Sequence, residues 1–116
     1  MQGPAVQELV ATRRSDGACG ILLAPRSGST AHVAAFGLPP LPVGLVYRVW
    51  VVVDQRRYNA GSFTVYSTGY GYVDLRLPTA LTELDSITVT IERAYGDREV
   101  DSNTATTGRA VLRGDL

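Results

Sequence analysis

Residues 37–53, Gly-Leu-Pro-Pro-Leu-Pro-Val-Gly-Leu-Val-Tyr-Arg-Val-Trp-Val-Val-Val, decide the fold of this chain. The first half holds prolines at 39, 40 and 42, which fix φ and lack a backbone donor, so it predicts a rigid corner outside any sheet. The second half, residues 46–53, is β-branched or aromatic apart from Arg48, which is typical of a strand. Both faces of this strand are apolar, so we expect a central strand covered on both sides. Arg48 then needs a carboxylate or the strand end beside it.

Seven further segments show strand composition and are separated by turn residues. They are residues 6–13, 18–24, 30–36, 58–66, 70–77, 86–93 and 109–113. In the two most regular segments, the residues expected to face inward are Val73, Leu75, Leu77, Ile87, Val89 and Ile91. Those expected to face outward are Asp74, Arg76, Thr88, Thr90 and Glu92. Gly17 and Gly69 indicate turns, and Gly61 indicates a bulge.

Eight short strands without a long helical pattern predict an all-β fold. We expect an antiparallel two-sheet β-sandwich, Ig-like or Greek-key-like, with one short helical crossover turn over residues 79–85. No internal repeat or linker divides the chain, so residues 1–116 are expected to form a single domain.

Charge and cysteine content exclude several classes of function. The 11 basic and 11 acidic residues are spread along the chain, which argues against binding to nucleic acid or to anionic lipid. A single cysteine rules out an intramolecular disulfide and a cysteine-based zinc site. We expect Cys19 to be a small apolar core residue. The chain shows neither a signal peptide nor about 20 consecutive apolar residues, so we expect it to be soluble as given, and its excision from a longer membrane protein stays open as an alternative.

No set of residues predicts an active site. His32, the only histidine, lies among alanine and valine with no neighbouring acid in the sequence, which favours a hydrogen-bonded structural role over catalysis. Carboxylate pairs at 83/85 and 97/99 occur in ordinary turns, although a hydrolase with dispersed carboxylates stays open as an alternative. We therefore expect neither enzymatic activity nor a cofactor.

One polar segment resembles a calcium-binding loop. Oxygen donors alternate at Asp97, Glu99, Asp101 and Asn103. The central glycine is missing, and Gly108 stands where the last acidic ligand belongs. We expect a solvated loop here, with weak calcium binding as the alternative, and no other metal site.

Four of the six tyrosines form the other candidate site. Tyr66, Tyr70 and Tyr72 flank one predicted hairpin tip, and Tyr58 lies on the paired strand. Exposed tyrosines would make a contact face for a protein or sugar. The alternative, which we favour, is that they cover the outer face of the sheet as cross-strand pairs.

The proline-rich segment also carries a family resemblance. Residues 37–42 (Gly-Leu-Pro-Pro-Leu-Pro), followed by Tyr47 and Trp50, resemble the C-terminal domain of anti-sigma-K factors of the RskA type. Residues 60–63 (Ala-Gly-Ser-Phe), 89–92 (Val-Thr-Ile-Glu) and 107–114 resemble later family segments, so the resemblance is expected to span about residues 18–114. Residues 93–96 and Thr106 depart from the pattern, which puts loop geometry in doubt more than the fold.

The resemblance implies a function without catalytic residues. It implies the extracytoplasmic domain of a single-pass membrane anti-sigma factor, which releases an extracytoplasmic-function sigma factor through regulated proteolysis. The implied partners are a protease and, through a cytoplasmic domain upstream, the sigma factor; the membrane contact would come from an upstream helix. The alternative is a secreted or surface β-sandwich module that binds carbohydrate or protein through Tyr66, Tyr70 and Tyr72.

Overall fold

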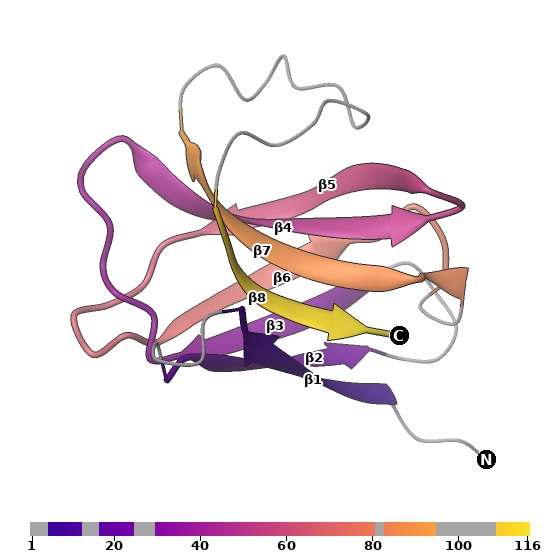
Figure 1. Ribbon diagram of the computed structural model, residues 1–116, viewed down its shortest axis with the longest axis horizontal. Helices are drawn as coiled ribbons and strands as arrows, with labels where there is room; N and C mark the ends of the chain where they lie inside the picture. The colour runs from indigo at the N-terminus through magenta and orange to yellow at the C-terminus, as the bar shows by residue number, and fades with distance from the viewer. Residues whose placement is uncertain (1–4, 13–16, 25–29, 81–82, 95–108) are drawn as a thin grey trace.

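The computed structural model describes residues 5–12, 17–24, 30–80, 83–94 and 109–116, and these form an all-β structure of eight strands (Figure 1). The strands are β1 (Ala5–Ala11), β2 (Cys19–Ala24), β3 (Thr30–Phe36), β4 (Leu45–Val53), β5 (Arg56–Phe63), β6 (Gly71–Arg76), β7 (Ser86–Arg93) and β8 (Ala110–Asp115). Every strand pairing is antiparallel. The all-β antiparallel prediction with eight strands is therefore confirmed.

The strands form one sheet in the order β5-β4-β7-β8-β1-β2-β3-β6, not two separate sheets. Strands β5, β4, β7 and β8 make one half, called here the β4 half, and β1, β2, β3 and β6 make the other, the β3 half. The halves are joined where Val10 and Ala11 of β1 pair with β8. In Figure 1, β4, β5 and β7 cross the upper part of the molecule, whereas β1, β2 and β3 cross the lower part.

The two outermost strands of this sheet approach each other, so the fold is nearly a closed barrel. A Cβ atom added to Gly61 of β5 would lie 3.2 Å from Leu75 Cδ2 and 3.3 Å from Val73 Cγ2 on β6. Contacts this short would crowd a side chain, which favours glycine at this point of β5. The expected two-sheet sandwich is therefore wrong in one respect, because the β1–β8 pairing makes the sheet continuous.

A single apolar core lies between the two halves. Its largest fully buried side chains include Tyr47 and Val49 from β4, Leu9 from β1 and Leu22 from β2. The inward residues predicted for β6 and β7 face this core, with Val73 and Ile91 partly buried at its margin. β4 is buried on both faces and pairs on both edges, as expected of a central strand.

The irregular parts follow the local sequence signals. Asp54 and Gln55 both have positive φ (52° and 67°) and form a two-residue turn, so β5 begins at Arg56, earlier than predicted, and ends at Phe63. Gly69 has positive φ, which confirms the turn expected there, and Gly17 also has positive φ, although the residues before it, 13–16, lie outside the described residues. The pairing of β4 with β5 shifts register between Val49 and Trp50, opposite Gly61, which confirms the bulge.

The proline corner lies outside the sheet, as predicted, and is tied to its surroundings by hydrogen bonds. Leu38 is buried, and its N–H donates to the carbonyl of Gly69 at 3.3 Å. The hydroxyl of Tyr47 donates to the carbonyl of Pro39. These two bonds connect the corner to β4 and to the turn before β6.

Only part of the expected crossover turn is described. Residues 81 and 82 lie outside the described residues. The N–H of Glu83 donates to the carbonyl of Ala80 at 2.9 Å, and Leu84 is buried in the core. Across the described ranges, no helix has the length and apolar character needed to cross a membrane.

Candidate functional site

The outer face of the β3 half carries a continuous apolar surface, called here the exposed outer face. Alternation along β1, β2 and β3 turns one set of side chains away from the core, and strand pairing aligns them in rows. Its eight large hydrophobic residues have exposed fractions between 37% and 71%. They are Val6, Val10, Ile21, Leu23, Phe36, Tyr66, Tyr70 and Tyr72.

Three of the four predicted tyrosines belong to this surface. The Tyr66 and Tyr70 rings are parallel, with centroids 6.4 Å apart, and Tyr70 lies 5.4 Å from the ring of Phe36 on β3. The N–H of Tyr66 also donates to the carbonyl of Tyr70 at 2.9 Å, which holds the turn. Tyr58 lies elsewhere, partly buried against the core. The structure therefore separates Tyr58 from the other three.

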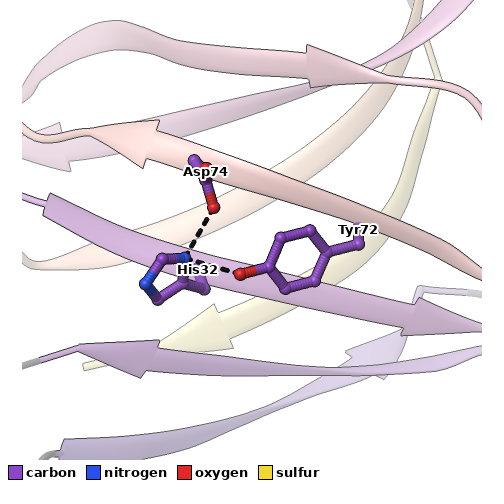
Figure 2. Close-up of polar contacts among 3 residues, drawn as sticks. All are labelled: His32, Tyr72 and Asp74. Carbon is purple, nitrogen blue, oxygen red and sulfur yellow. Dashed lines mark hydrogen bonds and ion pairs between the residues drawn. The ribbon is translucent and has the colours of Figure 1, made fainter.

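Tyr72 belongs to a polar group with His32 and Asp74 (Figure 2). His32 Nδ1 lies 2.7 Å from Asp74 Oδ1 and 2.8 Å from the hydroxyl of Tyr72. The rings of His32 and Tyr72 are stacked, with centroids 5.8 Å apart. These partners could not be predicted from the sequence, because both come from β6, about 40 positions further along the chain. Only the β3–β6 register brings them beside His32.

The geometry of this group supports a structural role. A catalytic relay needs the acid on one ring nitrogen and the hydroxyl on the other. Here both partners contact the same nitrogen, Nδ1, so Asp74 cannot activate the hydroxyl through the ring. The hydrogen bonds from His32 and then Tyr72 lower the pKa of Asp74, while partial burial and the bond to Asp74 raise the pKa of Tyr72.

Cys19 is exposed on this surface, between Val10 and Phe36, which corrects the prediction of a core residue. β2 is apolar on both faces, but its burial alternates, with Gly20, Leu22 and Ala24 facing inward. Cys19 therefore faces outward, beside Phe36 on β3.

The outer face of the β4 half differs, because its polar side chains are buried. The Trp50 indole N–H donates to Thr90 Oγ1 at 2.9 Å, and this hydroxyl donates to Glu92 Oε2 at 2.7 Å. Arg48 Nε donates to Ser62 Oγ at 3.1 Å. We call Arg48, Trp50, Thr90 and Glu92 the buried outer face.

This arrangement settles two sequence expectations. Thr90 and Glu92 lie on the outer face as predicted, but they are buried and not exposed to solvent. Arg48 is buried on the same face as Glu92: burial lowers the pKa of Arg48, and the charge of Glu92 raises it in part.

A pocket of about 350 Å³ adjoins the buried outer face and is rich in hydroxyls and guanidinium groups. Its described lining is Thr12, Trp50, Val52, Arg57, Ser86, Thr88, Thr90, Ala110 and Arg113. Hydroxyls and arginines suit an anionic group. However, Arg113 Nε already lies 3.4 Å from Asp115 Oδ1, which reduces the positive charge available there.

The remaining candidate ligands do not form a site in the described residues. Asp97, Glu99, Asp101 and Asn103, the residues of the calcium alternative, lie outside the described residues. Within the described part, no three His, Cys, Asp or Glu side chains are placed to hold a metal. Glu83 accepts a hydrogen bond from Thr79 and Asp85 accepts one from the N–H of Asp54, so these two carboxylates stabilise turns.

Comparison with known proteins agrees with the proline–tyrosine–tryptophan signature. No curated protein and no solved structure gives a significant match to the chain. Residues 1–109 match the family described as "Anti-sigma-K factor rskA, C-terminal". The match extends further toward the N-terminus than expected and ends just before β8, so the expected correspondence at residues 111–114 lies beyond it. Since the match includes seven of the eight strands, the chain belongs to the anti-sigma-K factor RskA C-terminal domain family.

Proposed function

We propose that this chain is the extracytoplasmic regulatory domain of a membrane-bound anti-sigma factor. In this proposal its folded state protects the longer protein from proteolysis, and loss of the fold starts the cleavage that frees a sigma factor. The observation that carries the proposal is the family match over residues 1–109. An anti-sigma factor acts by holding a protein partner, so a sigma factor is the partner that the family suggests.

The chemistry of the described residues supports a role without catalysis. His32 directs one ring nitrogen to both of its partners, and Glu83 and Asp85 are engaged in turns. What the sheet offers is a single cooperative unit with its core between two joined halves. Such a unit unfolds as a whole when its core is broken, which is the behaviour a protease-controlled switch requires.

The test uses one substitution at a buried and at an exposed valine in the complete product of the gene. Val49 is fully buried in β4, whereas Val43 in the proline corner is fully exposed. Val49→Asp places a charge in the core and should unfold the domain. We expect stepwise shortening of the membrane protein and a several-fold rise in transcription dependent on the partner sigma factor. Val43→Asp should behave like the wild type.

Two results would contradict the proposal. The first is an unchanged transcriptional reporter in Val49→Asp although limited proteolysis of the purified domain shows it to be unfolded. The second is a C-terminal tag that stays protected from added protease in intact spheroplasts, because that would place the domain on the cytoplasmic side.

A further inference from the structure

We infer that the exposed outer face is a self-association surface, on which two copies of this chain pack face to face as a symmetric dimer. The inference goes beyond the proposed function and does not depend on it, because it rests only on the β3 half. The surface consists of the eight side chains defined above together with the small residues Cys19 and Ala34 between them.

The size of the surface is the first argument. The exposed fractions of its eight large hydrophobic residues amount to roughly four whole side chains, or about 700 Å² at about 150–250 Å² for an aromatic side chain and less for an aliphatic one. This is about a tenth of the total accessible surface of 6981 Å². The largest apolar patch of a typical monomer is about 300–600 Å², whereas a stable interface takes about 800 Å² from each partner. The area therefore fits an interface better than a free monomer surface.

The distribution of charge is the second argument. The two central strands of the half, β2 and β3, present Cys19, Ile21 and Leu23 beside Phe36, Ala34 and His32. The acidic side chains Glu8 and Asp74 lie on the two flanking strands, β1 and β6. An apolar centre with charges at the rim is the usual anatomy of an interface, and homodimers have the most apolar centres.

The register of β2 and β3 is the third argument, because it makes the surface complementary to itself. Cys19 pairs with Phe36, and Ile21 pairs with Ala34, so two of the three rows hold one large and one small residue, while the third pairs Leu23 with His32. A two-fold axis parallel to the strands, between β2 and β3, places each residue of β2 over its row partner on β3 of the second copy. Ile21 then lies over the partner's Ala34, and Phe36 lies over the partner's Cys19.

The experiment measures the mass of the purified 116-residue chain by sedimentation equilibrium over a range of concentrations. The wild type should form a dimer with a dissociation constant on the order of 10 µM. Ile21→Arg places a charge at the centre of the interface and should weaken association by at least about 30-fold. The matched control is Val43→Arg, which adds the same charge at a fully exposed valine away from the surface and should leave association unchanged.

Cys19 supplies an independent readout, because it is the only cysteine and lies on the surface. Its rate of alkylation should fall as the protein concentration rises, with the same midpoint as the sedimentation data. In Ile21→Arg the rate should not depend on concentration. If Ile21→Arg does not fold, Ala34→Arg tests the same row from the neighbouring strand.

Three outcomes would overturn the inference. A chain that stays monomeric up to about 1 mM shows that the surface does not self-associate, and it would leave the surface for a different protein. A dimer that survives Ile21→Arg uses another surface. A dimer whose Cys19 reacts as fast as in the monomer also forms elsewhere.

Discussion

The two outer faces of this sheet differ in a way that reverses the usual rule for burial. The β4 half buries an arginine, a glutamate, a threonine and a tryptophan on its outer face. The β3 half leaves valine, isoleucine, leucine and phenylalanine exposed on its own. Both outer faces belong to one continuous sheet over one core, so the difference does not arise from the core itself.

The contrast assigns different roles to the two outer faces: the buried polar residues stabilise the fold, and the exposed apolar residues are available for binding. The buried polar groups bond to one another, from Trp50 through Thr90 to Glu92, and no described buried side-chain polar atom lacks a partner. Such groups specify one arrangement of strands because each depends on the next. The exposed apolar groups add nothing comparable to the stability of the monomer, which is why we assign them to an interface.

The largest expected effect comes from removing Trp50. Its side chain is only 2% exposed, and truncation to alanine leaves a cavity and removes the partner of Thr90. We expect Trp50→Ala to lower the free energy of unfolding by about 4 kcal/mol, measured by urea denaturation. Tyr72→Ala on the exposed outer face is the control and should cost far less. Equal losses would show that the two outer faces do not differ in energy.

A smaller loss is expected from Glu92→Gln, which keeps the size of the side chain and removes its charge. Arg48 and Thr90 then lose an ionic neighbour in a buried setting. We expect a loss of about 2–3 kcal/mol in the free energy of unfolding. Asp74→Asn makes the same kind of change on the exposed outer face, and its effect should not exceed the error of the measurement. A comparable loss in both variants would contradict the contrast.

A glycine introduced into the β4–β5 turn should stabilise the protein, whereas replacing the glycine in the turn before β6 should destabilise it. Gln55 has φ 67° in the β4–β5 turn, so Gln55→Gly relieves strain and should stabilise the protein by about 0.5–1 kcal/mol. Gly69 has φ 88° before β6, and an added Cβ would lie 3.1 Å from the carbonyl oxygen of Leu38. Gly69→Ala should destabilise by about 1–2 kcal/mol. Thermal unfolding of both variants checks the signs, and a loss in Gln55→Gly would contradict the assigned turn.

The smallest effect is a pH dependence confined to the exposed outer face. The pKa of Asp74 is lower in the folded protein than its ordinary value of 3.8, so the folded state favours the ionised carboxylate. The resulting stability is fully present above the ordinary pKa and is lost as the pH falls through the lowered pKa. Between about pH 5 and pH 3 the wild type should therefore lose slightly more stability than Asp74→Asn. Parallel pH profiles of unfolding would exclude this contribution.

The positions of the strands along the chain were predictable because they depend on the composition of each segment and on the proline and glycine residues between segments. β3 and β7 begin and end where the sequence predicted, and the prolines and Gly69 ended or turned the chain as expected. β5 begins at Arg56, two residues earlier than predicted, because Asp54 and Gln55 adopt positive φ and form a tight turn. Their side chains do not predict this conformation. The candidate site was predictable only in part: Tyr66, Tyr70 and Tyr72 adjoin in sequence and in space, whereas Tyr58 separates from them.

The sequence by itself determined the fold class, the strands, the turns and the family, because these follow from the alternation of side chains and from proline and glycine stereochemistry. The predicted inward faces of β6 and β7 were right, but tertiary structure alone decided whether a residue on an outer face is buried or exposed. Cys19 lies in an apolar strand and is nevertheless exposed. Glu92 lies on the polar face of its strand and is nevertheless buried. Alternation assigns residues to two faces, but whether an outer face meets solvent depends on what packs against it in three dimensions.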